Sequence, residues 1–309
     1  MRLEPSEMAR HLREAADLAE LPLPEVVLPG ENEFVANRLR LHYLDWGTAG
    51  RRPILFLHGG SLTARTWDLV CLALRRDYHC LALDLRGHGD SDWSPEADYS
   101  LEAHRGDVEA LVDHLGLERF VLVGMSLGGA VCLTYAGKHA GKLAALVLVD
   151  TGPETREAGR RRIAEFVSGP RELDSIEQFV ERAVAFNPLR RPELLRRSLL
   201  HNLRQTPDGK WTWKYDPRRM SSATAEDRDR RRRELWAEVP KISCPTLVVR
   251  GGYSENFLDE DAEKLAAALP RGSWVRIDGA GHTVQGDQPK ALVEALRRFL
   301  GSGADQAIR

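Results

Sequence analysis

The chain has 309 residues, of which 42% are apolar, and its 44 basic and 46 acidic residues leave a formal net charge of −2. This length and composition suffice for a sizeable buried core, and length alone would allow two domains. The even charge balance excludes the electrostatic footprint of a protein that binds nucleic acid or an anionic membrane surface, so we expect neither partner.

Targeting signals and metal-ligand patterns are missing from the sequence. The N-terminus is charged throughout, without the apolar core of a signal peptide, and no run approaches the length of a membrane span. The four cysteines are scattered, with no C-x-x-C pair and no histidine at ligand spacing: Cys71, Cys80, Cys132 and Cys244. They are typical of small buried side chains in a reduced compartment. We therefore expect a cytoplasmic protein that needs no metal or organic cofactor.

Residues 1–30 predict an N-terminal arm. The first twenty indicate an amphipathic helix, with Leu12 and Ala16 on its apolar face, and the proline-rich link Leu21–Gly30 follows. Three arrangements remain open: packing on the core, packing on a partner subunit, or a mobile arm. The chain is accordingly expected to be a monomer or a homodimer.

Residues 31–152 predict the first part of an α/β core. Phe34–Val35 and Leu39–Trp46 suggest an antiparallel opening pair, with Asn37 near the turn. Short apolar runs then alternate with helix-like runs, the strands near 54–57, 80–84, 120–124 and 145–149 and the helices near 66–75, 101–115 and 128–139. This alternation predicts a mostly parallel sheet with helices on both faces.

Residues 153–239 interrupt the alternation and predict an inserted helical segment. Helices are expected near 155–167, 175–185, 192–204 and 223–237, with an aromatic stretch at Trp211–Tyr215. The aromatic stretch either contacts a ligand or packs the insertion, and the mixed charges of the last helix are typical of a solvated face. Residues 240–300 return to the core pattern and end in a helix, and 301–309 predict a frayed tail.

The most informative motif is Gly124-Met125-Ser126-Leu127-Gly128, a G-x-S-x-G. It lies between an apolar strand and a helix-forming run, the context of a nucleophile elbow. Glycine tolerates the tight turn, and the serine hydroxyl is exposed at a helix N-terminus. Ser126 is therefore the candidate nucleophile.

An oxyanion hole needs two backbone N–H groups. One is expected from Leu127, the residue after the nucleophile. The other is expected from the loop His58-Gly59-Gly60-Ser61, which follows the apolar strand near 54–57. Gly60 is our candidate for that donor.

The candidate base is His282, in the loop after the strand Trp274–Ile277. The order serine, acid, histidine along the chain is one of the known arrangements of a catalytic triad. The other nine histidines lie in glycine turns, in helix-like stretches or near early strands, where structural hydrogen bonds or exposure are expected.

Three carboxylates compete for the third triad position, which orients the histidine and stabilises its charged form. Glu255 fits best, because it follows the strand Thr246–Arg250 by a few residues. Asp150 ends the neighbouring apolar strand and is the alternative acid, although it could instead cap the turn after it. Asp259 is the third candidate and lies where a helix begins.

Taken together, these motifs resemble those of α/β-hydrolase-fold enzymes with a serine nucleophile. The matching segments are Leu57–Gly60 (LHGG), Leu83–Ser91 (LDLRGHGDS), Val123–Gly129 (VGMSLGG), Leu146–Pro153 (LVLVDTGP), Leu247–Gly252 (LVVRGG) and Gly279–His282 (GAGH). The resemblance implies an α/β-hydrolase fold with an inserted helical cap over residues 153–239 that shapes the pocket. The resemblance assigns the role of nucleophile to Ser126, that of base to His282 and those of oxyanion donors to Gly60 and Leu127. The family usually has aspartate where Glu255 stands, and the chain departs from the pattern there.

The expected reaction is hydrolysis of a carboxylic ester or lactone of a small, fairly apolar molecule through an acyl-enzyme on Ser126. Three alternatives stay open on the same fold: a carbon–carbon bond hydrolase of a dienone-type ring-cleavage product, a cofactor-free perhydrolase or haloperoxidase, and a weakly catalytic or non-catalytic ligand receptor. Ser126 argues against haloalkane dehalogenases and epoxide hydrolases, which use aspartate at the elbow. Ser61-Leu62 departs from the H-G-G-P-G of proline iminopeptidases.

Overall fold

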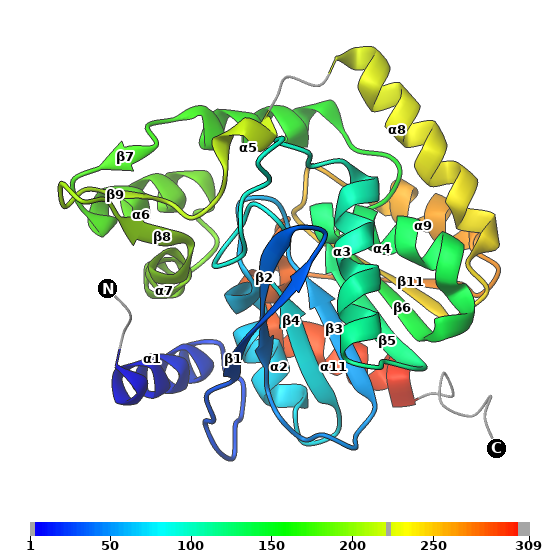
Figure 1. Ribbon diagram of the computed structural model, residues 1–309, viewed down its shortest axis with the longest axis horizontal. Helices are drawn as coiled ribbons and strands as arrows, with labels where there is room; N and C mark the ends of the chain where they lie inside the picture. The colour runs from blue at the N-terminus through cyan, green and yellow to red at the C-terminus, as the bar shows by residue number, and fades with distance from the viewer. Residues whose placement is uncertain (1–3, 221–223, 302–309) are drawn as a thin grey trace.

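An eight-stranded sheet forms the centre of the computed structural model, which describes residues 4–220 and 224–301 (Figure 1). Its strand order is β1-β2-β4-β3-β5-β6-β10-β11. The first two pairings, β1 with β2 and β2 with β4, are antiparallel, and the remaining neighbours are parallel. The strands are β1 (Gly30–Ala36), β2 (Leu39–Asp45), β3 (Pro53–Leu57), β4 (His79–Leu83), β5 (Phe120–Met125), β6 (Leu143–Val149), β10 (Thr246–Gly251) and β11 (Gly272–Ile277). The predicted mostly parallel sheet with an antiparallel opening pair is confirmed.

The central strands are apolar throughout because both of their faces are covered. In β5, Val121 and Val123 point into one hydrophobic cluster, whereas Phe120 and Leu122 point into the cluster on the opposite face. This is the two-residue alternation of a strand, with both sets of side chains buried. Every residue of β5 and β6 is buried.

Two groups of helices cover the two faces. The first face carries α1 (Pro5–Leu18), α2 (Asp68–Leu74) and α11 (Pro289–Gly301). The second carries α3 (Leu101–His114), α4 (Leu127–His139), α8 (Ala225–Glu238) and α9 (Asp259–Ala268). Helix α8 was assigned to the insertion from the sequence, yet its Leu235 is buried in the same hydrophobic cluster as α4. Figure 1 shows α8 lying alongside the core helices.

The N-terminal arm packs on the body of its own chain. Leu12 and Ala16 are fully buried in the first hydrophobic cluster, together with Leu21 of the proline-rich link. The Arg13 guanidinium donates to the Leu23 carbonyl at 2.9 Å, which fixes the link against the helix. Of the three arrangements left open by the sequence, the structure shows packing on the core.

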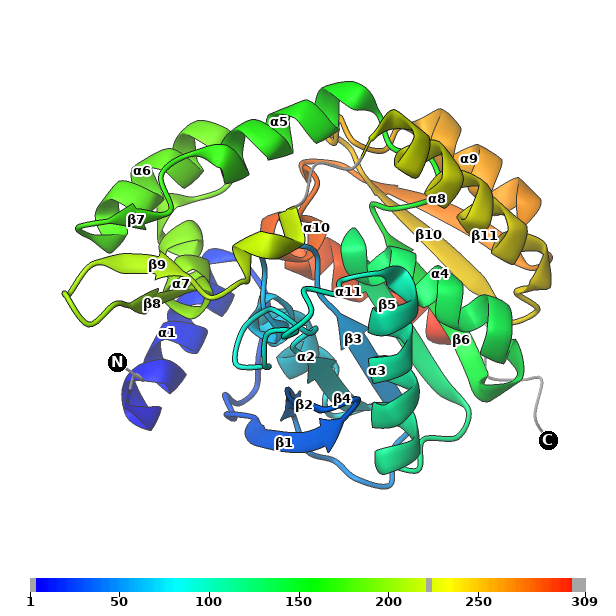
Figure 2. The same ribbon diagram turned by 45° about the horizontal axis from the view of Figure 1, so that its top comes forward.

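Between β6 and β10 the chain forms the predicted insertion. Its helices are α5 (Glu157–Ser168), α6 (Ile176–Phe186) and α7 (Pro192–Asn202), followed by the short 3-10 helix η3 (Pro217–Met220). A small sheet of order β7-β9-β8 was not predicted; its strands are β7 (Glu172–Leu173), β8 (Leu203–Gln205) and β9 (Trp211–Trp213). These strands are two or three residues long, too short to leave a recognisable period in the sequence. Figure 2 shows α5 and α6 forming an arc above the central sheet.

The aromatic stretch in β9 packs the insertion. Trp213 and Tyr215 are both almost fully buried, in a third hydrophobic cluster with Phe179 of α6. The rings of Trp213 and Phe179 meet edge to face, with centroids 5.1 Å apart. Trp213 and Tyr215 thus pack within the insertion, and contact of the stretch with a substrate stays a prediction. The predicted frayed tail lies outside the described residues, apart from Gly301 at the end of α11.

Candidate active site

Ser126 stands on a sharp turn between β5 and α4, as predicted for a nucleophile elbow. Its φ of 52° places it in the left-handed region, which is unusual for a residue with a side chain. The flanking positions have to be glycine, because a larger side chain would clash with neighbouring atoms. A Cβ at Gly124 would lie 2.4 Å from Cys132 Sγ, and a Cβ at Gly128 would lie 2.4 Å from the Leu57 carbonyl oxygen.

The loop after β3 lies directly beside this turn. The Gly128 N–H donates to the His58 carbonyl at 3.1 Å. A Cβ at Gly59 would lie 3.3 Å from the Ser126 Cβ. The structure therefore brings the loop that contains Gly60 next to Ser126 and Leu127. Their role as oxyanion donors stays a prediction.

His282 contacts Asp150. The His282 Nδ1 lies 2.6 Å from the Asp150 Oδ2, and Asp150 is fully buried. Two further donors hold the carboxylate, the Gly251 N–H at 2.9 Å and the Ser254 hydroxyl at 2.5 Å. A buried carboxylate with three hydrogen bonds has a fixed orientation, and it fixes that of the imidazole.

Asp150 and Ser126 are joined through the end of β6. The Ser126 N–H donates to the Val149 carbonyl at 3.3 Å. The Thr151 hydroxyl donates to the Ser126 carbonyl at 3.1 Å. The residues on either side of Asp150 therefore hold the backbone of Ser126, and Asp150 itself holds His282.

Our expectation that Glu255 contacts His282 is wrong. The Glu255 side chain is exposed and pairs with Arg162 of α5, with 3.1 Å between Oε2 and Nη1. The reason lies in the loop after β10, where the Tyr253 N–H donates to the Ala280 carbonyl at 2.7 Å. This turn directs Ser254 inward to Asp150 and leaves Glu255 outside.

The third candidate acid also lies elsewhere. Asp259 begins α9 and forms ion pairs with Arg250 at 2.9 Å and Arg276 at 3.0 Å. The sequence did not indicate Ser254, whose hydroxyl donates a hydrogen bond to the Asp150 carboxylate. Nor did it indicate Asp287, which accepts from the Gly281 N–H at 2.9 Å and braces the loop that carries His282. Neither side chain belongs to a recognisable motif.

His58 and His88 have structural roles, as expected for histidines in glycine turns. His58 Nε2 accepts from the Leu85 N–H at 3.0 Å, and its Nδ1 lies 2.7 Å from the Gly59 carbonyl. His88 Nδ1 lies 2.9 Å from the Arg86 carbonyl. Burial lowers the pKa of both imidazoles, so both are neutral at pH 7.

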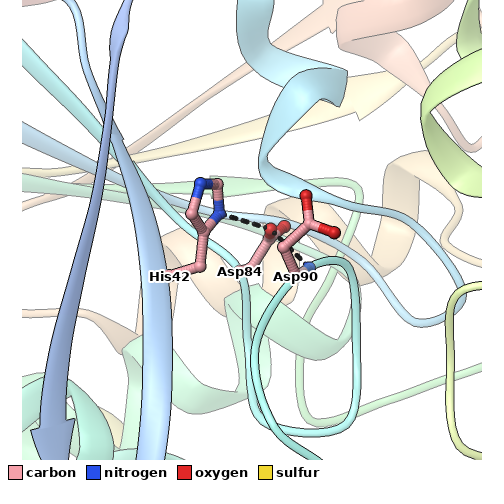
Figure 3. Close-up of side chains that lie close together, drawn as sticks. All are labelled: His42, Asp84 and Asp90. Atoms are coloured by element: carbon pink, nitrogen blue, oxygen red, sulfur yellow. Dashed lines mark hydrogen bonds and ion pairs between the residues drawn. The ribbon is translucent and has the colours of Figure 1, made fainter. Parts of the chain in front are cut away.

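A second histidine–carboxylate group lies near the start of the sheet. His42, Asp84 and Asp90 place one potential metal-ligand atom each within 4.8 Å of one another (Figure 3). The Asp84 carboxylate is already bonded, to His42 Nδ1 at 2.8 Å, the Ala64 N–H at 2.6 Å and the Asp90 N–H at 3.1 Å.

The charge of this group is also balanced. Burial opposes ionisation of Asp84, but the hydrogen bond with His42 holds the pKa of its carboxyl below the usual range. Lys214 of the insertion pairs with Asp90 at 2.9 Å. The group acts as a brace between β2 and the loops after β3 and β4.

The insertion forms polar contacts at three places around the candidate site. Arg162 of α5 reaches Glu255 in the loop after β10. The Asn187 amide donates to Asp287 at 3.0 Å, next to the His282 loop. Arg219 of η3 donates to the Ser61 hydroxyl in the Gly60 loop. The insertion therefore contacts two of these loops directly and the His282 loop through Asp287.

Comparison with known proteins agrees with this geometry. Residues 54–295 match the model of the alpha/beta hydrolase family. The chain is 34% identical over 286 residues to esterase Rv0045c of Mycobacterium tuberculosis, covering 90% of each sequence. The chain belongs to the α/β-hydrolase family, and it is a hydrolase.

Two further similarities support that membership. A crystal structure of the Mycobacterium tuberculosis esterase superposes with a TM-score of 0.77 at 32% identity, covering 97% of this chain and all of that one. A 3-hydroxybutyrate-oligomer hydrolase of Cupriavidus necator is 27% identical over 85% of this chain and 94% of its own. Within the described part of the chain, none of the helices is long and apolar enough to cross a membrane.

Proposed function

We propose that this protein hydrolyses carboxylic esters of small molecules through an acyl-enzyme on Ser126, with His282 as base and Asp150 as the third member of the triad. The observation that carries the proposal is the 2.6 Å contact between His282 and buried Asp150, which is joined through the end of β6 to the strained turn at Ser126. The acid is thus the alternative that the sequence offered, not Glu255.

In the first half of the reaction, His282 Nε2 accepts the proton of the Ser126 hydroxyl as its oxygen attacks the ester carbonyl carbon. Asp150 fixes the Nδ1–H tautomer and stabilises the imidazolium. The amides of Gly60 and Leu127 donate to the oxyanion. Collapse of the tetrahedral intermediate breaks the ester C–O bond, and His282 returns the proton to the leaving alcohol.

In the second half, His282 deprotonates a water molecule, which attacks the acyl carbon. The second tetrahedral intermediate releases the carboxylic acid and regenerates the Ser126 hydroxyl. Two relatives that act on esters by their names, the Mycobacterium tuberculosis esterase and the 3-hydroxybutyrate-oligomer hydrolase, support this class of substrate. The insertion, with its polar contacts at three places around the site, serves as the cap that shapes the pocket.

The test is hydrolysis of 4-nitrophenyl esters from acetate to octanoate by wild type, Ser126→Ala and Ser168→Ala. Ser168 is an exposed serine at the end of α5 and is the matched control. We expect a fall in kcat of about 10⁵- to 10⁶-fold in Ser126→Ala and wild-type turnover in Ser168→Ala. A fluorophosphonate probe should label wild type and not Ser126→Ala. Wild-type turnover in Ser126→Ala would refute the proposal.

A further inference from the structure

Arg219 of the insertion lies directly over the loop that contains Gly60. Its Nη1 is 3.2 Å from the position that a Cβ would take at Gly60, and its Nη2 donates to the Ser61 hydroxyl. The Tyr215 ring supports the guanidinium from the other side, with 4.8 Å between Cζ and the ring centroid. The side chain is thus held in place beside the proposed oxyanion hole.

The charge of Arg219 is not balanced by the protein. Among residues 4–220 and 224–301, Arg219 has no carboxylate within ion-pair distance, and its buried Nε has no hydrogen-bond partner. Burial lowers the pKa of its guanidinium, although the group still carries its charge at pH 7. A partly buried cation with unused donors is costly unless a ligand satisfies it.

Arg86 and Arg218, in contrast, are each paired with a buried carboxylate. Arg86 forms a two-pronged ion pair with Asp107 at 2.6 and 2.7 Å. Arg218, which directly precedes Arg219, donates to the buried Asp216 through Nε and Nη2. The Tyr99 hydroxyl donates to the same carboxylate. Asp216, the carboxylate closest to Arg219 in sequence, is therefore already occupied.

We propose that Arg219 binds a carboxylate of the substrate, so that the preferred substrates are esters that carry a free carboxylate a few bonds from the scissile carbonyl. This inference rests on the proposed ester hydrolysis at Ser126. A carboxylate matches the planar pair of N–H donors of one guanidinium. Because the guanidinium lies against Gly60, a substrate carbonyl in the oxyanion hole has room for only a short spacer before that carboxylate.

The test uses two pairs of esters with the same shape and different charge. Monoethyl succinate and ethyl 4-methylpentanoate differ on the acyl side, and 3-carboxyphenyl butanoate and 3-isopropylphenyl butanoate differ on the alcohol side. Rates are followed by pH-stat for wild type, Arg219→Met, Arg219→Lys and Arg161→Met. Arg161 is an exposed arginine of α5 paired with Glu165, so its loss removes the same charge from the insertion away from Gly60.

We expect wild type to prefer the acid-bearing ester in at least one pair. In Arg219→Met, the ratio of the two kcat/KM values in that pair should fall by about 10- to 100-fold, mainly through KM. Arg219→Lys should retain part of the preference, and Arg161→Met should retain all of it. Equal losses on both members of each pair would overturn the inference and indicate a role in packing or oxyanion binding.

One outcome does not depend on the folding of any variant. Wild type that hydrolyses the neutral ester at least tenfold better in both pairs also overturns the inference. Failure of the underlying proposal is separate, because it appears as Ser126→Ala activity on the neutral esters, whatever the Arg219 variants do.

Discussion

Replacement of Asp150 by asparagine is the sharpest test of the triad. Asparagine has the shape of aspartate and is among the residues that tolerate left-handed backbone, which matters because Asp150 has a φ of 48°. The backbone of the β6 end, which also holds Ser126, should therefore be preserved. The change removes only the charge and one acceptor oxygen.

The magnitude follows from the hydrogen bonds. The Asp150 carboxylate accepts from His282, the Gly251 N–H and the Ser254 hydroxyl. If the asparagine oxygen keeps the hydrogen bond from the Gly251 N–H, the side-chain NH₂ takes the place of Oδ2 and faces His282 and Ser254. The imidazole then has to accept at Nδ1, which places its proton on Nε2, where Ser126 needs a base. The same tautomer change in serine proteases lowers kcat about 10⁴-fold, which is about 5 kcal/mol of transition-state stabilisation.

The assay compares kcat/KM on 4-nitrophenyl butanoate for wild type, Asp150→Asn and Glu255→Gln. Glu255→Gln is the matched control, because it removes a carboxylate that forms only an exposed ion pair with Arg162. We expect it to stay within about twofold of wild type. The reasoning is refuted if Asp150→Asn retains more than about a tenth of the activity, or if Glu255→Gln loses more than about 100-fold.

Three further predictions concern stability. Asp107→Ala leaves buried Arg86 without its two-pronged partner and should lower the free energy of unfolding by about 3–5 kcal/mol in urea titrations; a loss below about 1 kcal/mol would contradict the buried pair. Leu12→Ala removes a fully buried side chain of the arm and should cost about 2–5 kcal/mol, whereas an unchanged urea midpoint would mean that the arm is detached in solution. Burial, with the nearby Arg86 charge, lowers the pKa of His104 to about 3. Below about pH 6.5 the unfolded chain therefore binds more protons than the folded one, and the free energy of unfolding decreases as the pH is lowered. His104→Gln should therefore lose about 2 kcal/mol less than wild type between pH 7 and pH 5, and equal losses would contradict the burial of a neutral imidazole.

The sheet and the elbow were predictable from the sequence because their signals are local. An apolar run as short as Phe120–Met125, bounded by turn residues, is typical of a central strand. The spacing of Gly124 and Gly128 around Ser126 follows from the sterics of one turn. The place of His282 was predictable for a related reason, since it lies in a short glycine loop after a strand. Each of these signals is contained within about ten residues.

The carboxylate that contacts His282 was mispredicted, because this contact depends on three separate segments of the chain. Whether Asp150 or Glu255 reaches His282 is decided by how the loop after β10 turns, and that turn is fixed by a backbone bond from Tyr253 to Ala280. The sequence included Asp150 among the candidate acids, but it did not show that Asp150 rather than Glu255 contacts His282. The position of α8 was missed for the same reason, since only the fold places Leu235 against α4.

The contact between Glu255 and Arg162 has a consequence of its own, because Asp150 and not Glu255 contacts His282. The outward carboxylate of Glu255 joins the loop after β10 to α5 of the insertion, while Ser254 in the same loop holds Asp150. One exposed ion pair is weak and is screened by salt, so this contact adds little to the other polar contacts of the insertion, such as those of Asn187 and Arg219. Position 255 can therefore be exchanged, or its ion pair strengthened by design, to alter the attachment of α5 to the core while Ser254 and Asp150 keep their hydrogen bond.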